Sequence, residues 1–193
     1  MKIAENIEIS TRIRGISSLE NRLQICKEDL DSQKILKKAV IINTDSRKGI
    51  KQLPNQYKLC VTSPPYLNSF DYTDIYRPEL FLGKFIKSSS ELKDLRFKTV
   101  RSHVEIKLPL PNTDSFGEIY QKVYKEINDS EDIWSKRIPI MIQSYFEDME
   151  LVLKDLYEKA LMGGELWLVV ANSVYAGIEV PVDLILAEIG TKN

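Results

Sequence analysis

The sequence is poor in the residues that build most metal centres and nucleophilic triads. Its 193 residues include one histidine, His103, and two cysteines, Cys26 and Cys60. A single histidine leaves little room for histidine-ligated metals or for Ser-His-Asp chemistry. Two cysteines make neither a disulfide framework nor a four-ligand zinc site. We therefore expect no bound metal, and any catalysis must use other groups.

Long apolar runs and an excess of one charge are also missing. No run approaches the roughly 20 residues that cross a bilayer, and the first ten residues lack the apolar stretch of a secretory signal. Lys and Arg number 27 against 28 Asp and Glu, so bulk charge gives no general case for nucleic-acid binding. With 43% hydrophobic residues the chain can bury a core. We expect one cytoplasmic domain over residues 1–193, without membrane contact.

Hydrophobic spacing predicts several elements. Ser17 and Glu20 have the spacing of a capping box and predict a helix from Ser17 to about Lys38. Its apolar face is Leu19, Leu23, Cys26, Leu30 and Leu36. Two later helices are predicted to open at Pro139 and at Pro181, the first ending at Gly163-Gly164. Three short continuous apolar runs predict buried strands: residues 39–42, 57–62 and 166–171.

Short apolar strands that alternate with helices indicate an α/β fold, with a parallel sheet core and helices on both faces. In such sheets ligands bind beyond the carboxyl ends of the strands. Three polar clusters occupy those ends: Asn43–Asp45, Thr62–Tyr66 and Asn172-Ser173. Strands lie about 4.8 Å apart, so we expect the clusters to converge within roughly 10 Å if the strands are neighbours.

The chemistry of the middle cluster is distinctive. Pro64 and Pro65 fix the backbone and remove two N–H donors, so the turn is rigid and rich in acceptors. The Ser63 hydroxyl and the Pro64 carbonyl can both accept hydrogen bonds, and Tyr66 offers a flat face. This combination suits a planar ring with an exocyclic amino group. Two acceptors would draw the nitrogen lone pair out of conjugation, and the nitrogen could then attack an electrophilic methyl group.

Residues 62–66, Thr-Ser-Pro-Pro-Tyr, continue as Leu-Asn-Ser-Phe-Asp-Tyr to Tyr72. This stretch resembles motif IV of the S-adenosylmethionine-dependent DNA amino-methyltransferases, and the Ser-Pro-Pro-Tyr form resembles the cytosine-N4 enzymes. Residues 44–47 resemble the acidic turn after the third strand of that fold, and residues 163–173 resemble a later strand and its end. The resemblance implies a partial Rossmann-like methyltransferase fold, S-adenosylmethionine as cofactor and DNA as substrate.

The resemblance also implies roles by position. The catalytic set would be Ser63, Pro64, Pro65 and Tyr66, with Ser63 and Pro64 on the amino group and Tyr66 stacked on the base. The cofactor set would be Asp45, Thr62, Asn172 and Ser173, and the substrate-side set would be Asn68, Asp71 and Tyr72. Residues 84–107 carry seven basic residues against three acidic ones and are a candidate DNA-backbone contact. His103 lies among these charges, and we expect it to be solvated.

One departure from the family pattern limits these expectations. The family's Phe-x-Gly-x-Gly cofactor loop is missing, because no two of the eight glycines are separated by one residue. We therefore expect an incomplete, truncated or split catalytic domain, with a variable substrate-side insertion at about 84–138 and a possible second chain supplying the loop. Adenine-N6 or RNA guanine-N2 methylation stays open, and so does an inactive chain that only binds DNA or a partner.

Overall fold

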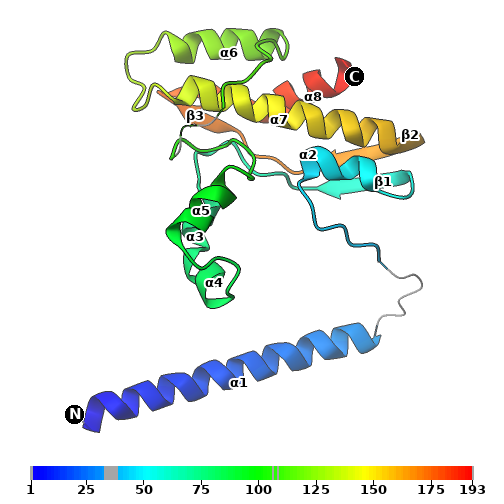
Figure 1. Cartoon of the computed structure of the whole chain (residues 1–193). Coiled ribbons are helices and arrows are strands. Elements are labelled where there is room, and N and C mark those ends of the chain that lie inside the picture. The colour runs from blue at the N-terminus through cyan, green and yellow to red at the C-terminus, as the bar shows by residue number, and fades with distance from the viewer. Residues whose placement is uncertain (1, 33–38, 106, 108, 193) are drawn as a thin grey trace. The chain divides into compact units, whose positions relative to one another are not determined.

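The structure is a computed structural model that describes residues 2–32, 39–105, 107 and 109–192, with side chains described from residue 15 onward. The chain divides into two compact units, residues 1–41 and 42–193. Figure 1 shows the elements of both units.

The first unit holds one long helix, α1 (Lys2–Ser32). The predicted start at Ser17 is wrong, because the helix is already continuous for fifteen residues before it and no unpaired N–H groups need a cap there. The side chains of residues 15–32 are all exposed, so the predicted apolar face is uncovered from Leu19 to Leu30. Leu36 and the predicted helix end near Lys38 lie outside the described residues. The predicted strand at 39–42 is also absent: no strand pairs with this run, and Ile41 is 89% exposed.

The second unit is built around α7 (Ile138–Lys159), and this helix confirms the one predicted to open at Pro139. It packs against α8 (Val182–Lys192), α6 (Glu118–Asn128), α2 (Ser46–Gly49) and the short 3-10 helix at Ile50–Gln52. Its buried apolar face is Ile138, Met141, Ile142, Tyr145, Phe146, Met149 and Leu153. Each such side chain contributes about 1.5–3 kcal/mol by leaving water, so this helix anchors the unit.

The predicted parallel sheet is confirmed as one pair of strands, β1 (Tyr57–Thr62) and β2 (Ala160–Leu168). Cys60 lies opposite Leu166, and Thr62 lies opposite Leu168. β2 follows α7 directly, so Gly163 and Gly164 lie inside the strand and do not cap the helix as predicted. Gly163 has a φ of +65°, which favours glycine, and it lies where the β1–β2 register shifts.

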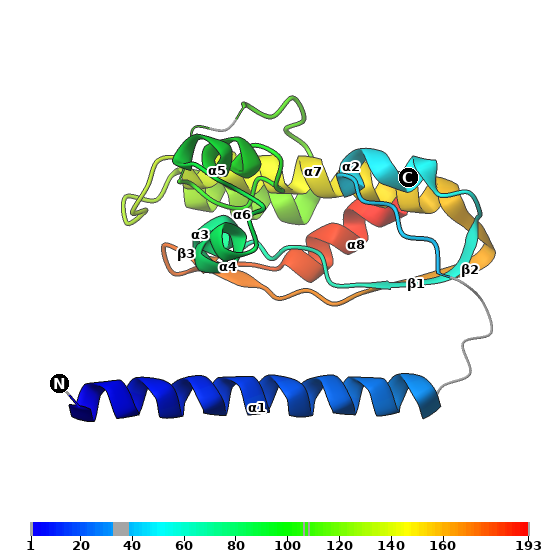
Figure 2. The ribbon, with the colours of Figure 1, turned by 60° about the horizontal axis from the view of Figure 1, so that its bottom comes forward.

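Helices cover one face of this pair within the second unit, and the expectation of helices on both faces is not met there. Figure 2 shows α2 and α7 on the same side of β1 and β2. Leu166 and Leu168 pack against the core from that side. On the other face four apolar side chains are more than half exposed: Leu59, Val61, Trp167 and Val169. The second unit brings its helices to one side of the strand pair, so the opposite face stays uncovered within this unit.

The remaining elements are short. β3 (Ser173–Tyr175) and β4 (Ile178–Val180) form an antiparallel hairpin that the sequence analysis missed. Its loop, Ala176-Gly177, has positive φ at both residues, as a type I′ turn requires. Three small helices lie together between β1 and α6: α3 (Tyr72–Ile75), α4 (Arg77–Leu82) and α5 (Ser89–Arg96). None of the helices in the described ranges is long and apolar enough to cross a membrane.

Candidate functional site

The Ser-Pro-Pro-Tyr turn begins one residue beyond β1, at the carboxyl end of the parallel pair. The Ser63 hydroxyl donates to the carbonyl of Val169, just past the end of β2, at 3.1 Å. The Tyr66 hydroxyl lies 3.1 Å from the same Ser63 oxygen. Since the one Ser63 proton is used on Val169, Tyr66 is the donor of the second bond. The turn is therefore fastened to the end of the neighbouring strand.

This arrangement leaves two acceptors available. With its proton on Val169, the Ser63 oxygen keeps a lone pair for a further donor. The Pro64 carbonyl accepts no hydrogen bond from any residue that the structure describes. An open hollow is lined by Ser63, Pro64, Pro65, Tyr66 and Tyr72. The geometry thus offers adjacent acceptors and two aromatic rings at one surface.

Three buried hydroxyl groups hold the loop that follows. Tyr145 on α7 donates to the Pro65 carbonyl at 3.0 Å, and Tyr175 on β3 donates to the Leu67 carbonyl at 3.0 Å. Ser173 also donates to the Leu67 carbonyl. Burial raises the pKa of both tyrosines well above the ordinary value, so both remain protonated donors. Sequence reasoning missed these tyrosines as supports, although a buried Tyr hydroxyl needs a partner and a proline turn supplies free carbonyls.

Asp45 lies in a short ion network. Its carboxylate accepts from the Arg47 side chain at 2.7 and 3.1 Å and caps α2 through the Arg47 backbone N–H at 3.0 Å. Arg47 also reaches Asp148 on α7 at 2.9 Å. The Arg47 guanidinium bound to Asp45 lowers the pKa of that carboxyl. Asp45 is therefore ionised at neutral pH and fixed in direction.

Asp148, a residue that the sequence analysis did not single out, joins two arginines. It is buried and also accepts from Arg101, at 2.8 Å to the guanidinium and 3.0 Å to the backbone N–H. Arg101 in turn pairs with Glu147 at 2.6 Å. The acids interrupt the apolar pattern of α7, and only the fold brings the arginines to them.

The structure brings two of the three predicted clusters to common cavities. Asp45, Ser46 and Pro65 line one cavity together with Phe70 and Tyr72. A neighbouring cavity is lined by Ser46, Thr62, Ser63, Pro64 and Pro65, with Cys60 and Leu168 of the strands behind them. Thr62 accepts the Val169 N–H through its carbonyl at 2.9 Å, so its backbone continues the sheet. The Asp45–Ser46 turn and the proline turn therefore line the same cavity, although no strand precedes Asp45 in the described part of the chain.

The third cluster lies on a different side of the loop. Ser173 is buried, and its hydroxyl donates to the Leu67 carbonyl. Asn172 is exposed and bonds Glu179 through its amide nitrogen at 3.1 Å, and its oxygen accepts from the Asp183 N–H at the start of α8 at 3.4 Å. Neither residue lines the cavities just described. The link from this cluster to the site is the hydrogen bond of Ser173 to the Leu67 carbonyl.

The substrate-side residues have three different environments. Asn68 is exposed and accepts from the Phe70 N–H at 3.2 Å within its own turn. Asp71 is buried, caps α3 through Thr73 and pairs with Arg96 at 2.5 Å. Burial would raise the pKa of Asp71, but the Thr73 hydrogen bonds and the Arg96 charge lower it overall. Tyr72 is 39% exposed and borders the hollow that holds the proline turn.

The basic residues of 84–107 divide into two groups. Arg96 and Arg101 are held by acidic side chains. The five lysines are exposed, and no ion pair joins them to another residue in the described ranges: Lys84, Lys87, Lys93, Lys98 and Lys107. These lysines are the part of the segment whose charge is free to meet an anion.

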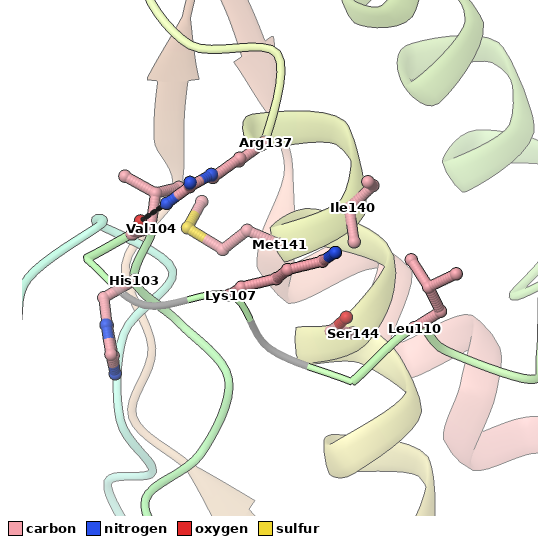
Figure 3. A pocket seen from close by; sticks show the side chains of 8 residues that line it. All are labelled: His103, Val104, Lys107, Leu110, Arg137, Ile140, Met141 and Ser144. Carbon is pink, nitrogen blue, oxygen red and sulfur yellow. Dashed lines mark hydrogen bonds between the residues drawn. The ribbon is translucent and has the colours of Figure 1, made fainter. Parts of the chain in front are cut away.

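The expectation that His103 is solvated is wrong. It is 2% exposed, and neither ring nitrogen has a hydrogen-bond partner among the described residues. Burial lowers its pKa, so the ring is neutral at pH 7. His103 lines the cavity that Asp45 and Pro65 border, and also a second cavity of about 280 Å³ against α7. Figure 3 shows the second cavity, where Arg137 donates to the Val104 carbonyl at 3.1 Å and the buried Ser144 hydroxyl has no described partner.

No group of three or more His, Cys, Asp or Glu side chains within the described part of the chain could hold a metal ion. The site's polar groups are hydroxyls, carbonyls, one carboxylate and arginines. That donor set suits hydrogen bonding to an amino-bearing ring and to a polar cofactor.

The chain is similar in sequence to Type II methyltransferases. The chain is 28% identical to the Type II methyltransferase M.BsoBI of Geobacillus stearothermophilus, over 89% of this chain and 39% of that protein. It is 30% identical to the Type II methyltransferase M.AvaI of Nostoc sp. and of Anabaena variabilis, over 78% of this chain and 34% of theirs. The chain thus spans between a third and two fifths of these relatives. No family model and no solved structure matches it.

Proposed function

We propose that this chain is the amino-group-binding part of an S-adenosylmethionine-dependent DNA methyltransferase that acts on cytosine N4. One observation carries the proposal: at the carboxyl end of a parallel strand, the Ser63 oxygen keeps one lone pair beside its bond from Tyr66, and the Pro64 carbonyl accepts from no described residue. The similarity to Type II methyltransferases over most of the chain supports it.

The acceptors perform the chemical activation. The two amino hydrogens of the base point at the Ser63 oxygen and the Pro64 carbonyl, which turns the nitrogen lone pair away from the ring. The cofactor supplies an electrophilic methyl group on sulfur. Methyl transfer would form the N–CH₃ bond as the S–CH₃ bond breaks, and the proton lost from the amino group would pass to water. Tyr66 and Tyr72 offer rings for stacking, worth about 1–3 kcal/mol per base, against a flipping cost of a few kcal/mol.

The choice of cytosine rests on the resemblance of the Ser-Pro-Pro-Tyr form to that of the cytosine-N4 enzymes. The Ser63 hydroxyl, whose proton is used on Val169, would accept one amino hydrogen of the base. Mass spectrometry of nucleosides from the DNA and, separately, from the RNA of cells that express the enzyme identifies the base. N4-methylcytosine supports the proposal, and N6-methyladenine or a methylated RNA guanine would replace it.

Asp45 is the proposed contact of this chain to the cofactor. It lies on the cavity that Pro65 also lines, and its partner Arg47 keeps it ionised and fixed in place. Thr62 borders the neighbouring cavity, and Asn172 and Ser173 act from behind the Leu67 loop. The missing Phe-x-Gly-x-Gly loop is supplied by polypeptide outside these 193 residues, either further along the same protein or in a second chain.

Calorimetric titration with S-adenosylmethionine tests the cofactor assignment. We would titrate the 193-residue chain alone, and again with polypeptide that carries the glycine-rich loop. Binding in either form that is lost in Asp45→Asn, and kept in the exposed control Asp129→Asn, supports the assignment. Absence of binding in both forms would contradict it and leave a chain that keeps the motif without the chemistry.

The five unpaired lysines of 84–107 are the proposed contacts to the DNA backbone. Each lysine that neutralises a phosphate adds about one to the slope of log affinity against log salt. We expect Lys93→Gln with Lys98→Gln to reduce that slope by about two, and Lys122→Gln on α6 to leave it unchanged. Fluorescence anisotropy with duplex DNA at several salt concentrations measures this slope, and an unchanged slope in the double variant would remove these lysines from the interface.

A further inference from the structure

The exposed side of α1 carries a regular apolar stripe. Ile16, Leu19, Leu23, Cys26 and Leu30 follow one another at intervals of three, four, three and four residues. The four aliphatic side chains are between 56% and 62% exposed, and Cys26 is also exposed. Alternating intervals of three and four place side chains at the a and d positions of a coiled coil. A helix with such a seam buries it against another helix.

The charges beside the seam choose the orientation of that second helix. With Ile16 at position a, Glu20 and Lys27 occupy the e positions, and Arg22 and Asp29 occupy the g positions. All four are exposed, and no ion pair joins any of them to another described residue. In a parallel pair, Arg22 would face Lys27 of the other helix, because g meets the following e position. Two like charges would then oppose each other at both edges.

An antiparallel pair resolves this conflict. When Leu23 of one helix packs opposite Cys26 of the other, Leu19 packs opposite Leu30. The e positions then bring Glu20 to Lys27, and the g positions bring Arg22 to Asp29. Twofold symmetry repeats each pair, so four attractive pairs flank four apolar layers.

The same charges reject the neighbouring registers. A shift of one heptad in either direction brings identical residues together across the twofold axis. In one direction Glu20 meets Glu20 and Arg22 meets Arg22, and in the other Lys27 meets Lys27 and Asp29 meets Asp29. Like charges at these distances are destabilising, so the pattern favours one register of self-pairing over its nearest competitors.

We infer that α1 is a dimerisation helix that binds α1 of a second copy of this chain as an antiparallel coiled coil, with Leu23 opposite Cys26. The occupant is a second copy because the charges complement themselves under twofold symmetry. This inference does not depend on the methyltransferase assignment, since it uses none of the residues of the catalytic site.

Sedimentation equilibrium of the full chain at about 1 to 200 µM tests the association. We expect a monomer–dimer equilibrium that Leu23→Glu abolishes, because the charge would lie within an apolar layer. Ser18→Glu, on the outer face, is the matched control and should leave the dimer intact. Circular dichroism verifies that both variants stay folded. A monomer throughout this range, or a dimer that survives Leu23→Glu, would overturn the inference.

A charge reversal separates the two orientations. Arg22→Glu places two acids opposite each other in the antiparallel dimer, and we expect its dissociation constant to rise about tenfold. Adding Asp29→Arg restores the opposite-charge pair and should restore the affinity. In a parallel dimer, Arg22→Glu would instead face Lys27 and strengthen association, and that result would overturn the orientation.

Cross-linking reads the register directly. Leu19→Cys with Leu30→Cys, in a background with Cys26→Ser and Cys60→Ser, places the new thiols opposite each other only between antiparallel copies. Within one helix these positions are about 16 Å apart, which is too far for a disulfide. After oxidation and trypsin digestion, we expect a peptide pair linked from residue 19 to residue 30. Links from 19 to 19 and from 30 to 30 would show a parallel dimer and overturn the inference.

Discussion

The two long helices of this chain make an instructive comparison. α7 and α1 both carry an apolar stripe at helical spacing, flanked by charged side chains. On α7 the stripe lies in the core, and the acids Glu147 and Asp148 meet Arg101 and Arg47 of the same unit. On α1 both the described part of the stripe and its flanking charges are exposed. Apolar spacing therefore predicts which face of a helix will be buried. It does not predict whether that face is buried by the same chain or by another.

The largest expected difference between the helices concerns packing. Phe146 is fully buried on α7, between Phe116, Tyr120 and Tyr145. We expect Phe146→Ala to lower the free energy of unfolding by about 3–5 kcal/mol. Leu23→Ala on α1 should leave the unfolding of residues 42–193 unchanged, while weakening self-association. Urea unfolding followed by tyrosine and tryptophan fluorescence measures the free energy of unfolding of both variants. An equal loss of stability in Leu23→Ala and Phe146→Ala would contradict this prediction.

The buried charges of α7 give the next effect. Asp148 is 3% exposed and serves two arginines, so Asp148→Asn leaves cationic groups poorly paired in the interior. We expect a loss of about 3 kcal/mol in the free energy of unfolding. Glu158→Gln is the control, because its contact to Lys51 is 3.9 Å long and exposed, and it should change stability by less than about 0.5 kcal/mol.

Acid should also show, without any mutation, that stability depends on these ionised carboxylates. Hydrogen bonds from Arg101, Thr113 and Asn112 outweigh burial and lower the pKa of Glu147 below its ordinary value of 4.5, and Arg47 lowers that of Asp45 below 3.8. A lowered folded-state pKa contributes stability that is present above these values and lost as the pH falls through the folded pKa. We therefore expect the thermal midpoint to fall below about pH 4.5, by less in Glu147→Gln. A midpoint that is flat to pH 3 would contradict these contacts.

A smaller effect concerns the hydroxyl that α7 offers to the proline turn. Tyr145→Phe removes one donor to the Pro65 carbonyl and keeps the ring in the core. We expect a loss of about 1 kcal/mol in stability. Hydrogen exchange of the backbone N–H groups of Tyr66 and Leu67 should become faster, whereas Tyr157→Phe, an exposed tyrosine on the same helix, should change neither. Unchanged exchange in Tyr145→Phe would mean that the turn is held by the other tethers alone.

Much of the site's position could be predicted from the sequence. A proline pair cannot continue a strand, so Ser63 to Tyr66 had to form a turn at the end of β1, and the structure places them there. The helix predicted to open at Pro139 is likewise present as α7. Other assignments failed because local pattern was the only information. Residues 39–42 have the composition of a strand but no neighbour to pair with, and His103 lies among charges yet is enclosed by the fold.

What the sequence determined by itself was local: the turn chemistry, the direction of each apolar face and the charge order along α1. These follow from side-chain and backbone properties within a few residues. Only the tertiary structure decided which distant groups complete them. Asp148 lies 101 residues from Arg47, Tyr145 lies 80 residues from Pro65, and Val169 lies 106 residues from Ser63. Such partners are selected by the packing of α7 and β2, since a buried polar group is stable only where the fold brings its hydrogen-bond partner to it.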